Sequence, residues 1–236
     1  MRIKSGLFGI LWLLLLSSAI CAETIQLGKA DSLFSAQKYT EAFVIYEDIL
    51  KLDQASPSML LKMAFIQDAS GNYTDALYYL DLYYQISADR FAVGKIEEIA
   101  SEFQLSGYQY NDLHYFNALY GKYKLHIILL LLSLSVLLLA YIARKSRIGE
   151  KAYIASVFQF AAIILVVWAT NVQTSRTGII MDDLTLLRSG PSAGAEPIEV
   201  VTKGHKVKVV SQSEIWTKVL WNGNEVFVRS NRLKLI

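Results

Sequence analysis

The chain has 236 residues, of which 53% are hydrophobic and only 19% are charged. About a quarter of the residues in a soluble globular domain are charged, so part of this chain is expected to lie outside water. The net charge of +2 argues against a strongly basic nucleic-acid-binding protein, and a single cysteine excludes a disulfide framework and a cysteine-based zinc site.

The first apolar block runs from Leu7 to Ile20, after a short basic start and before a group of small residues. This layout predicts a secretory signal peptide over residues 1–22. Two alternatives remain. One is a lipoprotein signal in which Cys21 is acylated, although Ile20 stands where such signals place a small residue. The other is an uncleaved membrane anchor.

Two further apolar blocks, residues 125–142 and 152–170, are predicted to be transmembrane helices. At 1.5 Å per residue, 18 residues span roughly 27 Å, which is close to the thickness of the hydrocarbon core of a bilayer. No ionisable residue lies deep in either block. Transport and proton paths usually carry such residues, so the two helices are expected to act as anchors.

The segment between these helices, residues 143–151, is predicted to be a cytoplasmic loop. It contains four basic residues and one acidic residue, a net charge of +3. Short positive loops stay on the cytoplasmic side, so the regions before and after the helix pair should both face outward. This orientation agrees with the predicted export signal.

The region from residue 23 to residue 124 is acidic and contains an internal repeat. It holds eight basic and 14 acidic residues, a net charge of −6. Residues 38–42 (Lys-Tyr-Thr-Glu-Ala) are echoed by residues 72–76 (Asn-Tyr-Thr-Asp-Ala) at an offset of 34. The period and pattern resemble the tetratricopeptide repeat, in which small residues let two helices approach closely. The matched positions that carry the resemblance further are Ala30/Ala64, Tyr46/Leu80 and Leu50/Tyr84.

The resemblance implies a concave groove that is lined by the first helix of each repeat and holds peptides or partner helices. By register, the candidate groove residues are Leu27, Asp31, Phe34, Leu61, Phe65 and Asp68. Packing between repeats is the alternative for the apolar members of this set. Two repeats cannot cover their own apolar edges, so further helices are expected over residues 91–105 and 111–123.

Residues 171–236, with a short linker at their start, are predicted to form a small all-β barrel. Turn signals at Lys203-Gly204 and Asn222-Gly223-Asn224 separate short β-rich runs and predict hairpins. Five or six short strands over roughly 60 residues suit such a barrel. The predicted strands cover residues 198–201, 207–210, 217–221, 225–228 and 233–236, after an opening strand near residue 185.

The order of these elements resembles that of bacterial SH3-like domains. The resemblance rests on Arg188-Ser189-Gly190-Pro191-Ser192, on Trp216-Thr217-Lys218-Val219 and on the Asn222-Gly223 turn. It implies binding of peptides or cell-wall glycan. Trp216 and Trp221 are the candidate stacking residues of that ligand surface, and a position in the core is the alternative for each.

The residue pattern contains no signature of catalysis. The three histidines are widely separated, and no HExxH helix, glycine-rich phosphate loop or GxSxG elbow is present. We therefore expect no enzymatic activity, no cofactor and no metal site. A hydrolase with an unrecognised site is the remaining alternative.

The sequence as a whole predicts a multidomain membrane protein with an export signal, all-α tetratricopeptide hairpins, two transmembrane helices and a C-terminal all-β SH3-like barrel. This order, with residues 106–112 (Ser-Gly-Tyr-Gln-Tyr-Asn-Asp), resembles the tetratricopeptide proteins of bacterial aerotolerance operons, the Bat type. The basic loop and the export signal predict an inner-membrane protein with both soluble domains in the periplasm. The repeat groove and the absence of a catalytic cluster predict a non-enzymatic scaffold, and the resemblance implies that it acts beside von Willebrand A-type proteins and a MoxR-type ATPase in envelope stress. The alternative is a cell-wall or peptide-binding protein that acts through the barrel.

Overall fold

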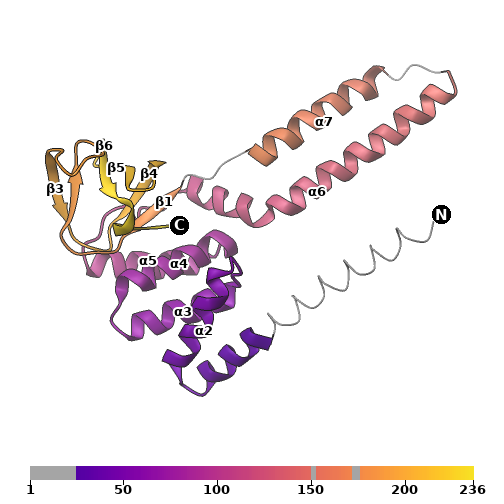
Figure 1. The fold of residues 1–236 in the computed structure, drawn as a ribbon. Helices are drawn as coiled ribbons and strands as arrows, with labels where there is room; N and C mark the ends of the chain where they lie inside the picture. Colours follow the sequence, from indigo (N-terminus) through magenta and orange to yellow (C-terminus); the bar gives the residue numbers. More distant parts are fainter. Residues whose placement is uncertain (1–24, 150–152, 172–175) are drawn as a thin grey trace, which may run out of the picture. The chain divides into compact units, whose positions relative to one another are not determined.

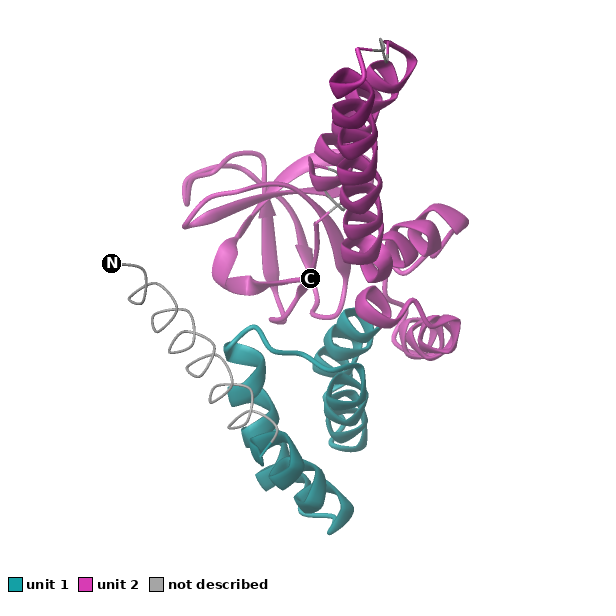
Figure 2. Ribbon diagram, turned by 90° about the vertical axis from the view of Figure 1, so that its right-hand side faces the viewer, with its two compact units in different colours: residues 1–83 teal, residues 84–236 magenta. Residues whose placement is uncertain are grey.

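The computed structural model describes residues 25–149, 153–171 and 176–236 (Figure 1). The predicted signal peptide, residues 1–22, lies outside the described residues. The chain divides into two compact units, Met1–Tyr83 and Tyr84–Ile236 (Figure 2).

The described part of the first unit is helical. Residues 25–35 form one helix, and α2 (Tyr39–Lys51), α3 (Pro57–Ala69) and the first part of α4 (Tyr73–Ser87) follow after short turns. The start of α3 shows why these breaks occur where they do. The Ser56 hydroxyl accepts a hydrogen bond from the Met59 amide, and Pro57 takes the first helical position, where its missing N–H costs nothing.

The positions related by the offset of 34 form the core of these helices. Helices α2 and α4 begin 34 residues apart, at Tyr39 and Tyr73. Small side chains at the matched positions allow the helix backbones to approach closely, and burying them against one another stabilises the stack. The buried repeat positions, each at most 5% exposed, are Ala30, Ala42, Tyr46, Ala64, Ala76 and Leu80.

The second unit opens with the end of α4, then α5 (Arg90–Glu102) and α6 (Asp112–Arg147). Helix α6 is one continuous helix of 36 residues, so the expected helix 111–123 and the apolar block 125–142 are parts of a single element. Its start is fixed by a capping box, in which Asn111 and His114 each accept a hydrogen bond from the backbone of the other. The basic residues of the predicted loop that the structure describes lie in the last turn of α6, where cations complement the helix dipole.

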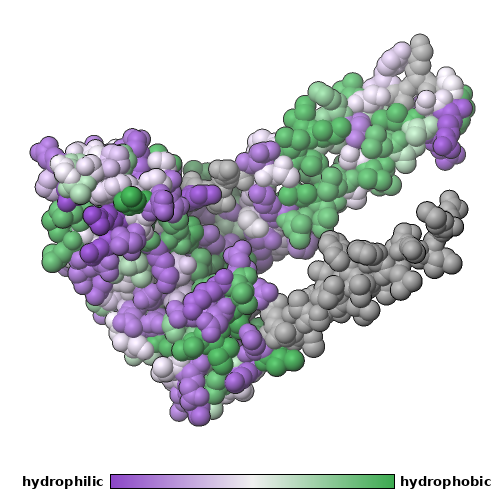
Figure 3. Space-filling view, in the orientation of Figure 1, coloured by the Kyte–Doolittle hydropathy of each residue, from purple (hydrophilic) through white to green (hydrophobic). Residues whose placement is uncertain are grey.

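Helix α7 (Tyr153–Asn171) runs antiparallel to α6 and packs along it. Near one end, the Tyr120 hydroxyl donates a hydrogen bond to the Ala169 carbonyl at 2.6 Å. Further along the pair, Gln159 Nε2 donates to the Ser135 hydroxyl at 2.8 Å. By length and composition, both helices could cross a membrane, and the exposed surface along the middle of the pair is largely apolar (Figure 3).

The C-terminal region is a seven-stranded antiparallel sheet in the order β3-β2-β6-β5-β4-β1-β7. Strand β1, which the sequence analysis did not anticipate, pairs with both β4 and β7. The strands are β1 (Thr177–Ile180), β2 (Thr185–Arg188), β3 (Pro197–Val201), β4 (Lys206–Gln212), β5 (Trp216–Trp221), β6 (Asn224–Arg229) and β7 (Leu233–Leu235), with a 3-10 turn, η1 (Ser230–Arg232), before β7.

One of the two predicted hairpin turns is confirmed and the other is wrong. Asn222 and Gly223 both have positive φ values and join the paired strands β5 and β6, as a two-residue hairpin requires. Lys203 and Gly204 connect β3 to β4, which are not neighbours in the sheet. The amide of Gly204 donates instead to the carbonyl of Ile180, so this turn packs against β1.

Buried and exposed side chains alternate along the central strands, so that one set forms the barrel core and the other forms its outer face. Side chains of a strand point to opposite faces in turn, so only every second residue can be buried. In β5 the buried residues are Thr217, Val219 and Trp221, and in β6 they are Val226 and Val228. The residues between them form an outer surface.

Candidate functional site

Strands β2, β5 and β6 bring a group of long side chains together on the outer face of the barrel. Trp216 of β5 stands directly opposite Arg229 of β6, and Arg188 of β2 stands opposite Phe227 of β6. Directly opposed residues share a face, and so do residues two apart on one strand. Trp216, Arg188 and Arg229 are therefore close neighbours on a single surface.

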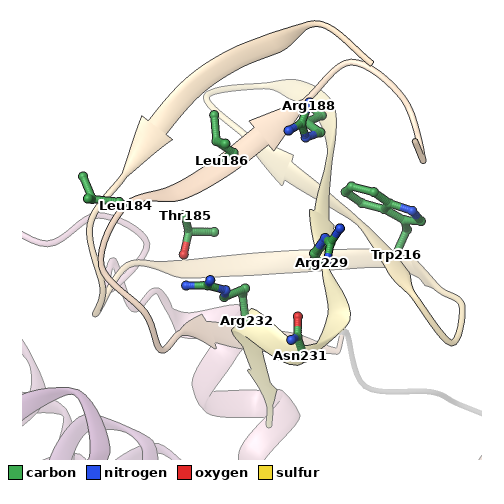
Figure 4. Close-up of a pocket in the computed structure, with 8 residues that line it drawn as sticks. All are labelled: Leu184, Thr185, Leu186, Arg188, Trp216, Arg229, Asn231 and Arg232. Atoms are coloured by element: carbon green, nitrogen blue, oxygen red, sulfur yellow. The ribbon is translucent and has the colours of Figure 1, made fainter. Parts of the chain in front are cut away.

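These side chains border a cavity of about 270 Å³ (Figure 4). Its walls come from the loop before β2, from β2 itself, from the start of β5, and from the end of β6 with the 3-10 turn that follows. The lining residues are Leu184, Thr185, Leu186, Arg188, Trp216, Arg229, Asn231 and Arg232. Three of them are arginines and none is acidic.

The three arginines differ in how their charge is compensated. Arg232 Nη1 lies 3.1 Å from Asp182 Oδ2, so this guanidinium has a carboxylate partner. Arg188 Nη1 donates to the Ala195 carbonyl at 2.7 Å, and the Arg229 guanidinium carbon lies 5.7 Å from the centre of the Trp216 ring. Among the described residues, neither Arg188 nor Arg229 has a carboxylate partner.

The loop before β2 is held in an unusual conformation at the rim of the cavity. Leu184 has a φ of 57° and is 75% exposed, a combination that is costly for a bulky apolar residue. Ion pairs fix the residues on its N-terminal side: Asp182 with Arg232, and Asp183 with Lys203 at 3.0 Å. The hydrogen bonds from Lys203 hold the pKa of Asp183 below its ordinary value.

The two candidate tryptophans lie on opposite faces of β5. Trp216 is half-buried and lines the cavity. Trp221 is 8% exposed and belongs to the barrel core, because it is an odd number of residues away from Trp216 on the same strand. Its indole N–H donates to Glu199 at 2.7 Å, and its ring stacks edge-on against His205 at 5.3 Å. The core alternative therefore describes Trp221, whose position does not support a role in stacking on a ligand.

Two of the candidate groove residues in the first unit take part in packing. Phe34 and Phe65 form an edge-to-face cluster with Tyr39, the aromatic residue at the start of α2, with ring centres 5.3–5.9 Å apart. Leu27 is half-buried. Leu61 and Asp68 are exposed, and Phe65 remains 51% exposed although it takes part in this cluster.

Asp31, the other candidate on the first helix, is part of a polar cluster. It accepts a hydrogen bond from the Tyr46 hydroxyl at 2.6 Å and pairs with the Lys62 ammonium group at 2.7 Å. Partial burial opposes ionisation of this carboxyl, but the hydrogen bonds from Lys62 and Tyr46 outweigh it and lower the pKa of Asp31. This carboxylate therefore links three consecutive helices.

Residues 106–110, which we call the strap, contact the barrel. The sequence analysis did not identify this contact. The Tyr108 hydroxyl donates to the Gly204 carbonyl at 2.7 Å, and the Lys206 amide donates to the Ser106 carbonyl at 3.0 Å. The ammonium group of Lys206 lies 4.9 Å from the centre of the Tyr110 ring, a cation–π distance. Nearly 100 residues separate the partners in sequence, so no local pattern could have predicted this contact.

The cavity arginines were also missed, because each lies on a different element and no short motif joins them. The only signal in the sequence was the alternation of inward and outward side chains along each strand. Once Val226 and Val228 are assigned to the core, Phe227 and Arg229 must point outward beside Trp216 and Lys218.

Comparison with known families places the cavity within a recognised domain. Residues 185–234 match the family described as Bacterial SH3 domain. No curated protein and no solved structure matches the chain. The match covers strands β2 to β6 and every cavity residue except Leu184. The C-terminal region of this protein is thus similar to bacterial SH3 domains, as its order of motifs predicted.

Proposed function

We propose that this protein is a membrane-anchored binding protein whose C-terminal barrel holds a cell-wall ligand. The observation that carries the proposal is the cavity on the bacterial SH3 domain, where the half-buried ring of Trp216 lies beside two guanidinium groups that have no carboxylate partner in the described part of the chain. A concave site with a few convergent polar groups and an aromatic wall is typical of ligand binding. This observation favours the alternative from the sequence analysis, a peptide- or wall-binding protein.

The strap supports the proposed membrane topology. Residues 106–110 precede α6 and the barrel follows α7, yet the two are hydrogen-bonded to each other. An antiparallel helix pair that crosses a membrane returns the chain to the side from which it started. The positive charge of the connecting segment then favours the outward side for the barrel, where cell wall is present.

The experiment is a pelleting assay with the full-length protein in nanodiscs and purified cell-wall sacculi. Wild-type protein is expected to pellet with the sacculi, and Trp216→Ala is expected to pellet much less. Lys218→Gln, a change on the same outer face but outside the cavity, serves as the matched control. Failure of the wild-type protein to pellet would overturn the proposal.

A scaffold that binds protein partners through its helices is a second candidate function. The burial of small residues at positions 34 apart supports a tetratricopeptide arrangement, and the exposed side chains of Leu61 and Phe65 offer an apolar contact surface. The expected partners are von Willebrand A-type membrane proteins and a MoxR-type ATPase. Co-purification after mild detergent extraction should recover them with the wild-type protein and lose them with Leu61→Asp. Isolation of the intact wild-type protein without them would contradict this role.

A further inference from the structure

We propose that the cavity on the barrel recognises a free carboxylate, and that Arg188 and Arg229 together bind it. The inference rests on the proposed function, because it names the chemical group of the wall that this site would bind. The ligand is a cell-wall peptide that ends in a small apolar residue and carries its carboxylate at that end.

The sheet geometry directs both guanidinium groups to one place. Arg229 is two residues after Phe227 on β6, and Phe227 is the direct partner of Arg188 on β2. The two arginines are therefore diagonal neighbours, a spacing that long side chains bridge. Figure 4 shows both at the end of the cavity that holds Trp216.

The pattern of compensated and uncompensated charge favours an anion at this end. Asp182 forms an ion pair with Arg232. Arg188 donates one N–H to the Ala195 carbonyl, and its other guanidinium N–H groups remain available to a ligand. Arg229 contacts the Trp216 ring, and its planar donor fork has no hydrogen-bond or ion-pair partner among the residues that the structure describes. Two planar forks that border one cavity suit a carboxylate, which accepts paired hydrogen bonds from arginine.

The rest of the cavity indicates what accompanies the carboxylate. Leu184, Leu186 and the Trp216 ring provide an apolar wall. A volume of about 270 Å³ lies below the usual range for drug-sized ligands, so it suits one or two residues rather than a stretch of glycan. The two ion pairs that fix Asp182 and Asp183 keep Leu184 at the rim although its backbone conformation is unfavourable. Cell-wall peptides combine alanine side chains with free carboxylates, which is the combination that this wall and these arginines fit.

The direct test compares two probes that differ only in charge at the terminus. N,N′-diacetyl-Lys-D-Ala-D-Ala and its C-terminal amide would be titrated into full-length protein in nanodiscs, with calorimetry as the readout. We expect the acid to bind at least tenfold more tightly than the amide, since a hydrogen bond to a charged group contributes a factor of roughly 10 to 100. Equal affinity for the acid and the amide would overturn the inference.

Variants locate the effect in the cavity. Arg229→Gln and Arg188→Gln should each reduce affinity for the acid by about tenfold and leave the weak binding of the amide unchanged. Arg229→Lys should lose less, because it keeps the charge but not the fork. Lys218→Gln removes one positive charge from the same face, outside the cavity, and should match the wild-type protein. An equal loss of affinity for the acid in Lys218→Gln would show that the effect is only general electrostatic attraction. That result would overturn the assignment.

A final comparison separates this inference from the proposed function. Sacculi would be used intact and after conversion of their free carboxylates to amides. Pelleting with intact but not with amidated sacculi supports both proposals, and equal pelleting with both overturns only the carboxylate. Binding of the peptide acid without pelleting of sacculi keeps carboxylate recognition and overturns the wall as its source. No binding in either assay overturns both.

Discussion

The hydroxyl of Tyr108 donates a 2.7 Å hydrogen bond to the carbonyl of Gly204, a residue 96 positions further along the chain. The Tyr108 side chain is only 5% exposed, so the bond is shielded from competing water. Beside it, the amide of Ser106 donates to His205 Nδ1 at 3.0 Å. The strap thereby ties the segment before α6 to the turn that precedes β4.

We expect Tyr108→Phe to weaken the strap by about 1–2 kcal/mol, because the buried Gly204 carbonyl loses its donor. Hydrogen exchange of the peptides that cover residues 104–110 and 203–207 is the measurement. Both peptides should exchange faster in the variant, while those of β5 and β6 stay unchanged. Unchanged exchange of the strap would show that the bond contributes nothing.

Gly107→Ala should disrupt the strap more strongly than Tyr108→Phe. Gly107 has a φ of 94°, and an added Cβ would overlap the carbonyl oxygen of Lys206, which is backbone and cannot move aside easily. Gly94→Ala in α5 is the control, since open space surrounds that position, and it should stabilise the helix by about 0.5–1 kcal/mol. Gly107→Ala should lower the temperature of thermal unfolding and speed hydrogen exchange of residues 104–110, whereas Gly94→Ala should raise the unfolding temperature and leave that exchange unchanged.

The strap should weaken in mild acid through His205. Burial lowers the pKa of His205 below its ordinary value of 6.5, and the nearby carboxylate of Glu199 opposes this only in part. Nδ1 accepts a hydrogen bond from the Ser106 amide, which requires the ring to be neutral when the strap is bound. A lowered folded pKa contributes stability that is complete above pH 6.5 and is lost as the pH falls below 6.5 through the folded value. Protection of the Ser106 amide, corrected for intrinsic exchange, should fall over this window.

The matched variant for this experiment is His205→Gln, whose amide oxygen can accept but does not titrate. Its protection factor at Ser106 should not depend on pH between about 5 and 8, the range in which histidine is the side chain that ordinarily titrates. The same pH dependence in both proteins would exclude His205 as the titrating group.

The hydrogen bond between Gln159 and Ser135 should specify the packing of α6 on α7. Ser135→Ala leaves the buried Gln159 amide unpaired and should destabilise the pair by about 0.5–1.5 kcal/mol. Gln159→Leu removes both the donor and its buried carbonyl oxygen, which has no partner among the described residues, and should cost less. Steric-trap or denaturant unfolding in detergent measures both variants. A larger cost for Gln159→Leu would contradict this account.

Asp31 should stabilise the first unit by linking its helices. Asp31→Ala leaves the Tyr46 hydroxyl without its acceptor, and the Tyr46 side chain is fully buried, so a loss of about 1–3 kcal/mol is expected in urea unfolding. Asp48→Ala removes an exposed pair with Lys51 and should change stability by less than about 0.5 kcal/mol. Because the pKa of Asp31 is lowered, its contribution is complete above pH 3.8 and disappears as the pH falls through the folded value. Equal losses in the two variants would contradict a special role for Asp31.

Local patterns predicted the elements whose signals lie close together in sequence. Asn222-Gly223 predicted the β5–β6 hairpin, and a motif order over 50 residues indicated the SH3 domain. The failures have a different cause. Strand β1 and the turn at Gly204 depend on pairings with partners far along the chain.

The sequence alone identifies the two helices that could span a membrane, because the length and hydropathy of its apolar blocks suffice for this. The same holds for the offset of 34, which relates the starts of α2 and α4 and the buried small residues Ala42 and Ala76. Only the tertiary structure decides which outward side chains meet. It brings Arg188, Trp216 and Arg229 to one cavity, turns Trp221 into the core and joins Tyr108 to Gly204. The physical reason is that strand register and long-range hydrogen bonds depend on where distant segments pair, and a single residue of register reverses which face a side chain takes.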